Sequence, residues 1–230
     1  MKKFLTVLLM LTLVLSLVAC GGDKFDPSAK SEGVMTYAEY DAAALDADVV
    51  IEGYVQAKQS WWDNKATVYL QDPDGAYFVY EMACSEEDYA KLTVGTKIKV
   101  TGYKGAWAEE VEIMDATFEI MEGTWVAEAM DATALLGTAD LIKHQNKFVK
   151  FEDLTIEAVE YKNGEPGDDI YVTVSKDGAS YSFCVERYLT GPETDVYKAF
   201  ADIKAGDVVD VEGFLYWYNG VNTHITAVSK

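Results

Sequence analysis

The chain has 230 residues and contains an internal repeat, which limits the folds it can adopt more than any other feature. Segment 97–103 reads Lys-Ile-Lys-Val-Thr-Gly-Tyr and segment 208–214 reads Val-Val-Asp-Val-Glu-Gly-Phe, so both end in a glycine and an aromatic residue. Gly95 precedes the first segment at the spacing at which Gly206 precedes the second. A duplication of about a hundred residues predicts two tandem domains, which we place at 34–122 and 123–230.

Apolar and polar residues alternate with a period of two in five segments of each copy, which predicts β-strands. In the first copy the predicted strands are 49–57, 66–71, 76–82, 97–103 and 109–120, and in the second they are 148–161, 170–175, 179–186, 208–216 and 221–228. Ser85, with Asp88 three residues later, predicts a capped helix after the third strand, and a second helix is expected to start about Pro192. The Asp-Gly pair within 72–75 predicts a tight hairpin with positive φ angles. We therefore predict a mainly β chain of two five-stranded barrels with the strand order of an OB fold, each with one helix between its third and fourth strands.

Two segments carry a resemblance to a known family. Val68-Tyr69-Leu70-Gln71-Asp72 and the run 95–103 resemble OB-fold domains of bacterial surface lipoproteins and of proteins that accompany secreted nucleases. The resemblance covers 34–230 and is more specific for fold than for function, because OB barrels bind many kinds of ligand. It implies a binding module, and nucleic acid is the ligand most often associated with the family.

The N-terminal segment has the pattern of an export signal. Lys2 and Lys3 precede an apolar run over 4–17, which is shorter than a comfortable transmembrane span. The sequence Leu17-Val18-Ala19-Cys20-Gly21 resembles a bacterial lipobox, which implies that 1–19 is removed and that Cys20 becomes the lipidated first residue of a protein anchored on the extracytoplasmic face of the membrane. The alternative is an ordinary secretory signal with a chance cysteine. Residues 20–33 are polar and glycine-rich, which predicts a flexible linker with the ordered chain starting near Val34.

The chain is strongly acidic, with a formal net charge of −20. Removal of 1–19 leaves 17 basic side chains against 39 acidic ones, a charge of −22, and Arg187 is the one arginine. Phosphate binding relies on arginine and lysine, so this balance disfavours nucleic acid as a partner. The acidity also has a simple explanation as a solvated surface.

Aromatic residues mark a candidate ligand face in the first copy. OB folds bind ligands on the outer face of strands two and three and between the loops that join strands one to two and four to five. The first of these loops contains Trp61 and Trp62, and the second contains Trp107. Alternation places Tyr69 on the outer face, and Tyr77 is expected to join it. Flat rings of this kind stack on sugars or on nucleic-acid bases.

The second copy offers a matching set, with Trp217 and Tyr218 in the loop between its last two strands and Tyr216 and Tyr171 nearby. The alternative for every one of these aromatic residues is that they pack against each other or seal an interface between the barrels. Three functional hypotheses follow. The first is a non-catalytic binding protein for an extracellular oligosaccharide or other oligomer, the second is a protein-docking subunit of an envelope complex, and the third is the single-stranded nucleic-acid binding that the family implies.

Other chemistry is sparsely represented in the sequence. His144 and His224 lie far apart in the sequence and lack the spacing of a metal motif, so we expect no metal. No nucleophile, base and stabilising group occur together, so we expect no enzyme activity and no cofactor. The motif 72–75 lacks the glutamate that a calcium loop needs, since position 83 is alanine. Cys84 and Cys184 are expected either to form one disulfide or to remain buried thiols.

Overall fold

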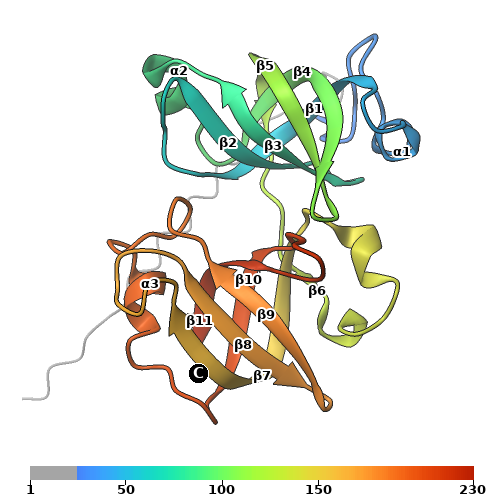
Figure 1. The fold of residues 1–230 in the computed structure, drawn as a ribbon. Helices are drawn as coiled ribbons and strands as arrows, with labels where there is room; N and C mark the ends of the chain where they lie inside the picture. Colours follow the sequence, from blue (N-terminus) through green and yellow to red (C-terminus); the bar gives the residue numbers. More distant parts are fainter. Residues whose placement is uncertain (1–24) are drawn as a thin grey trace, which may run out of the picture.

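The computed structural model describes residues 25–230, which form two β-barrels joined by a short connection (Figure 1). The predicted mainly β class is therefore confirmed. The predicted signal segment, 1–19, and Cys20 lie outside the described residues. Within 25–230, none of the helices has the length and apolar character needed to cross a membrane.

Barrel 1 is the N-terminal barrel and has the strand order of an OB fold. Its strands are β1 (Asp48–Lys58), β2 (Lys65–Gln71), β3 (Ala76–Ala83), β4 (Thr96–Trp107) and β5 (Glu110–Thr124). They pair in the order β1-β2-β3-β5-β4, and β1 also pairs with β4, which closes the barrel. Helix α2 (Glu86–Lys91) lies between β3 and β4 and is capped as predicted, because Ser85 Oγ accepts a hydrogen bond from Asp88 N. A further helix, α1 (Tyr37–Ala42), precedes β1 and starts with a capping box of Thr36 and Glu39.

Barrel 2 repeats this order. Its strands are β7 (Phe148–Tyr161), β8 (Ile170–Lys176), β9 (Ala179–Val185), β10 (Val208–Phe214) and β11 (His224–Ser229), with the short strand β6 (Met130–Asp131) beside β7. The order is β10-β11-β9-β8-β7, and β10 pairs with β7 to join its two ends. Two 3-10 turns, η1 (Thr133–Leu135) and η2 (Leu141–His144), precede β7, and helix α3 (Asp195–Ala199) lies between β9 and β10. The last strand starts at His224, later than predicted, because Trp217 and Val221 form an isolated bridge within the preceding loop.

Each barrel has its own apolar core. Ile51, Val68 and Leu70 belong to the core of barrel 1, whereas Phe151 and Phe183 belong to the separate core of barrel 2. All five of these side chains are fully buried. The period-two alternation of the strands therefore supplies a buried inner face in both copies.

The turn between β2 and β3 differs from the prediction. Neither Asp74 nor Gly75 has a positive φ, whereas Asp177 and Gly178 in the hairpin between β8 and β9 have φ values of 52° and 84°. The side chain of Asp72 closes the first turn instead, because its Oδ1 accepts hydrogen bonds from the backbone N–H groups of Asp74 (2.7 Å) and Gly75 (2.9 Å). A side-chain acceptor of this kind removes the need for left-handed residues.

Residues 25–33 lie against barrel 1, so contacts with the barrel begin ahead of the predicted start at Val34. Lys30 Nζ lies 2.5 Å from Asp72 Oδ2 and donates to the carbonyl of Glu52 at 2.7 Å. The ring of Phe25 meets the edge of the Tyr54 ring at a centroid distance of 6.4 Å. The N-terminal part of the described chain is thus held by a buried ion pair and an aromatic contact.

A third apolar cluster joins the two barrels. We call it the interbarrel cluster, and its buried members are Tyr69, Phe78 and Phe214. Tyr69 on β2 stacks on Phe214 of β10 at 4.5 Å, and Phe78 on β3 meets the edge of Tyr216 at 5.2 Å. The outer face of β2 and β3 is therefore partly covered by barrel 2.

Hydrogen bonds beside the interbarrel cluster connect the β4–β5 hairpin of barrel 1 to the β10–β11 loop of barrel 2. Trp217 N donates to Glu110 Oε2 at 2.8 Å, and Asn219 N donates to the carbonyl of Ala108 at 2.7 Å. Because apolar and polar contacts act together across this junction, the structure presents the two barrels as one body (Figure 1).

Candidate ligand-binding cleft

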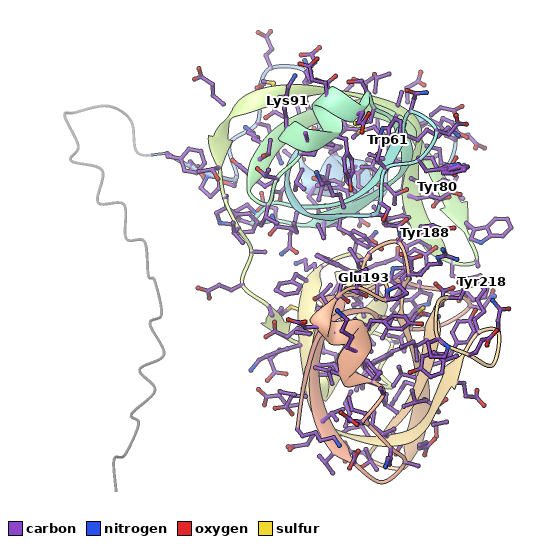
Figure 2. All side chains as sticks on the ribbon, turned by 90° about the vertical axis from the view of Figure 1, so that its left-hand side faces the viewer. Trp61, Tyr80, Lys91, Tyr188, Glu193 and Tyr218 are labelled. Carbon is purple, nitrogen blue, oxygen red and sulfur yellow. The ribbon has the colours of Figure 1, made fainter. Side chains whose placement is uncertain are left out.

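A cleft of about 1010 Å³ lies where the two barrels meet. Barrel 1 contributes the β1–β2 loop and the outer face of β2 and β3, and barrel 2 contributes segments around β8, the end of β9 and the β10–β11 loop. Figure 2 shows Tyr80, Tyr188 and Tyr218 along one side of this junction. The aromatic side chains that line the cleft are Trp61, Trp62, Phe78, Tyr80, Tyr171, Tyr188, Tyr216 and Tyr218.

The cleft brings together the surfaces that OB folds use for ligands. In barrel 1 it follows the outer face of strands two and three, and in barrel 2 it adjoins the loops that join strands one to two and four to five. A concave surface with many rings and a few polar groups is the usual form of a ligand site. The tandem arrangement thus makes one composite candidate site from surfaces of the two barrels.

Five of the residues predicted from the sequence line this cleft. Trp62 is 75% exposed and presents its ring to solvent, and Tyr218 is 54% exposed. Trp61 is partly buried, and its Nε1 donates to the carbonyl of Cys84 at 2.9 Å, which fixes the indole. Tyr171 and Tyr216 complete the predicted set on the side of barrel 2.

The structure places the remaining predicted aromatic residues elsewhere. Tyr77 belongs to the core of barrel 1, so its predicted outward direction is wrong; it pairs in register with Leu70, which also faces inward. Trp217 lies in the core of barrel 2, and Tyr69 points outward as predicted but is covered by Phe214. Trp107 is 63% exposed at the end of β4 and is not among the residues that line the cleft.

Sequence reasoning missed three of the aromatic residues that line the cleft. Phe78 and Tyr80 lie two residues apart on β3, so the alternation that places one of them outward places both. Tyr188 follows the end of β9 in a segment with no periodic pattern, and its carbonyl accepts a hydrogen bond from Ser60 N of barrel 1 at 2.7 Å. A contact of that kind depends on how the barrels meet, which alternation within one copy does not encode.

The positive charges of the cleft are already paired. Lys65 Nζ lies 2.7 Å from Glu81 Oε2, and the guanidinium of Arg187 lies 3.7 Å from Asp168 Oδ1. Apart from His224, these are the basic side chains that line the cleft. Glu186 also lines it, and burial raises the pKa of this carboxyl to about 7.

His224 has a structural role in the cleft wall. Burial lowers its pKa to about 3, so the ring is neutral at physiological pH, and its Nδ1 lies 2.6 Å from the hydroxyl of Tyr69. Cys84 and Cys184 are free thiols, so the disulfide alternative is not formed. Among residues 25–230, no group of three or more His, Cys, Asp or Glu side chains is arranged to hold a metal ion.

No protein-family model and no curated protein matches the chain. Among solved structures, a murine DNA-binding protein bound with double-stranded DNA is similar over 76% of this chain and 90% of its own, at 9% identity and a TM-score of 0.37. The p202 HIN1 structure in complex with a 12-mer double-stranded DNA is similar over 82% and 94%, at 11% identity and a TM-score of 0.37. The p204 HINb domain is similar over 77% and 94%, at 11% identity and a TM-score of 0.34.

Proposed function

We propose that the protein is a lipid-anchored, non-catalytic binding protein whose two OB barrels hold an extracellular oligosaccharide in the cleft between them. The observation that carries this proposal is the set of eight aromatic side chains, drawn from both barrels, that line one cleft. Rings of tyrosine and tryptophan stack on the apolar faces of sugars, and tyrosine hydroxyls and carboxylates hydrogen-bond sugar hydroxyl groups. A cleft that follows both barrels suits an extended ligand better than a compact one.

Nucleic acid, the ligand that the OB resemblance implies, is the second candidate. Stacking on Trp62 or Tyr218 would serve a base as well as a sugar. Affinity for a phosphate backbone, however, comes from lysine and arginine side chains that are free to neutralise phosphates, which releases the counterions of the nucleic acid. Lys65 and Arg187 already face Glu81 and Asp168, and the chain carries a net charge of −20. These charges favour the oligosaccharide.

A protein-docking role is the third candidate. It would need a broad apolar surface that continues across both barrels. The apolar surface that the barrels present to each other is occupied by their own contact, since Tyr69, Phe78 and Phe214 are buried there. Among the exposed aromatic residues, Trp62, Tyr80, Tyr171, Tyr188 and Tyr218 line the cleft, which supports a ligand site over a partner interface.

A binding screen tests the proposal. The full chain, purified in a zwitterionic detergent, is titrated with neutral oligosaccharides, with single- and double-stranded DNA and with peptides, in low and in high salt. We expect an oligosaccharide to bind in both salts and Trp62→Ala to weaken its binding. Trp107→Ala is the matched control, because Trp107 is also exposed, at 63% against 75% for Trp62, but lies outside the cleft. Tight DNA binding that persists at high salt and is lost in Trp62→Ala would overturn the order of the candidates.

The anchoring part of the proposal rests on the lipobox resemblance at Cys20. A diacylglyceryl group inserts two acyl chains, which hold a protein to a bilayer stably, whereas one chain binds marginally. We expect Cys20→Ala to leave the protein either uncleaved or released from the membrane in cell fractionation. Detergent-dependent membrane association of a Cys20→Ala protein whose signal has been removed would contradict the anchor.

A further inference from the structure

Glu186 differs from the other acidic residues of the cleft because no cation faces it. Its Oε2 accepts a hydrogen bond from Leu189 N at 2.8 Å, and within residues 25–230 no lysine or arginine lies within ion-pair distance of it. The adjacent Arg187 is directed to Asp168 and lies over the ring of Tyr188 at 5.0 Å. The cleft therefore contains one carboxyl group without a counter-charge.

The surroundings of Glu186 disfavour its charged form as long as no positive partner is present. Burial raises the pKa of its carboxyl to about 7, and the carboxylate of Asp169 on the same cleft wall adds to the rise. Lys162 opposes this effect only weakly, since its Nζ is engaged by Asp169 Oδ2 at 2.9 Å. A carboxyl in this position is stabilised in its charged form when a cation enters the cleft.

The rings around the cleft add to the preference for a cation. Tyr171 and Tyr218 are exposed and line the cleft together with Glu186, and the faces of tyrosine rings attract ammonium groups. The net charge of −20 attracts cations to the surface as a whole. A neutral sugar would use the rings but leave Glu186 without a partner, and a phosphate would be repelled by it.

We propose that the oligosaccharide bound in the cleft carries free, positively charged amino groups, and that Glu186 binds one of them. This inference rests on the proposed function and narrows its ligand class to amino sugars. A hydrogen bond between a carboxylate and an ammonium group is charge-assisted, so it favours the amine over the uncharged amide that forms when the same nitrogen is acetylated. Glu186 then acts as the residue that determines specificity.

The test compares two ligands that differ only in this charge. Oligomers of glucosamine and of N-acetylglucosamine, of equal length, are titrated into the full chain by calorimetry at a pH near the raised pKa of Glu186, about 7, so that the amines and the Glu186 carboxylate can both carry charge. We expect the amine oligomer to bind more tightly. Glu186→Gln should lower its affinity about ten- to a hundredfold, the range for a hydrogen bond to a charged group, and leave the affinity for the acetylated oligomer unchanged. Glu157→Gln, an equal loss of charge at an exposed position of β7, is the matched control.

A second measurement covers the case in which Glu186→Gln fails to fold. In the unaltered chain, the affinity for the amine oligomer should fall with added salt, while the affinity for the acetylated oligomer should stay constant. Equal affinities for the two oligomers, or salt-independent binding of both, would overturn the role of Glu186 and leave the proposed function standing. Failure of both oligomers to bind, together with tight DNA or peptide binding, would overturn the proposed function itself.

Discussion

The hydroxyl of Tyr69 in barrel 1 lies 2.6 Å from Nδ1 of His224 in barrel 2, in a site that is closed to solvent. Gln59 Nε2 donates to the same hydroxyl at 3.1 Å, so the hydroxyl proton is directed to His224. This network assigns the neutral His224 ring the tautomer that carries its proton on Nε2. Because Tyr69 also stacks on Phe214, one side chain couples the barrels by a hydrogen bond and by an aromatic contact.

Tyr69→Phe separates these two effects. The substitution keeps the ring on Phe214 but leaves His224 Nδ1 buried without a donor, which costs about 1 to 3 kcal/mol. We expect a lower free energy of unfolding in denaturant titration. Tyr103→Phe is the control, because the hydroxyl of Tyr103 has no hydrogen-bond partner among the described residues. Equal stability of the two variants would show that the Tyr69 hydroxyl does not hold the barrels together.

Trp62 and Trp217 should respond in opposite ways to truncation. Trp62 is 75% exposed and lines the cleft, so Trp62→Ala is expected to reduce ligand binding and change stability by less than about 0.5 kcal/mol. Trp217 lies in the core of barrel 2, so Trp217→Ala should cost about 3 to 5 kcal/mol. Thermal melts and ligand titrations of the two variants check both expectations. A large stability loss in Trp62→Ala would place its ring in a packed environment.

The sequence predicts the strands well because every strand has one face in a core. The predicted 148–161 matches β7 (Phe148–Tyr161), and 76–82 lies within β3 (Ala76–Ala83). Alternation fails on β3 for the direction of Tyr77, since Phe78 is also buried and the strand has apolar residues on both faces. That second buried face exists only because barrel 2 covers it. The same contact between the barrels creates the cleft. The pattern of residues within one copy therefore does not predict that Tyr188 and Glu186 line it.

Glu112 makes stability depend on pH. It is 4% exposed, and burial, with a smaller contribution from Glu81, raises its pKa to about 7 from an ordinary value of 4.5. The folded state therefore binds more protons than the unfolded state between these two values, so stability falls as the pH rises through this range. We expect Glu112→Gln to raise the melting temperature at pH 8 and to change it little at pH 4. Glu157→Gln, at an exposed site, should change neither. An equal effect of Glu112→Gln at both pH values would contradict the raised pKa.

Lys30 should be important for the stability of barrel 1 although it precedes the first strand. Its side chain is 9% exposed and neutralises the fully buried Asp72 carboxylate. Lys30→Met leaves that carboxylate without a cation, which costs about 3 to 5 kcal/mol. Lys99→Met is the control, because Lys99 pairs with the largely exposed Glu119 at 3.1 Å and such pairs contribute about 0 to 1 kcal/mol. If both substitutions have the same small effect in thermal unfolding, residues 25–33 are not held as the structure indicates.

Phe214→Ala should destabilise the full chain more than an isolated barrel 2. A fragment of residues 123–230 contains all five strands of barrel 2 and its separate core, so we expect it to unfold cooperatively on its own. In the full chain Phe214 is 3% exposed beneath Tyr69, and Phe214→Ala should cost about 3 to 5 kcal/mol. In the fragment the partner ring is gone and Phe214 keeps its contact with Phe148, so the same change should cost less. The measurements are circular dichroism and denaturant melts of the full chain and of the fragment, each with and without Phe214→Ala. An unfolded fragment would contradict the independence of barrel 2. An equal loss of stability in the full chain and in the fragment would contradict the contact through the interbarrel cluster.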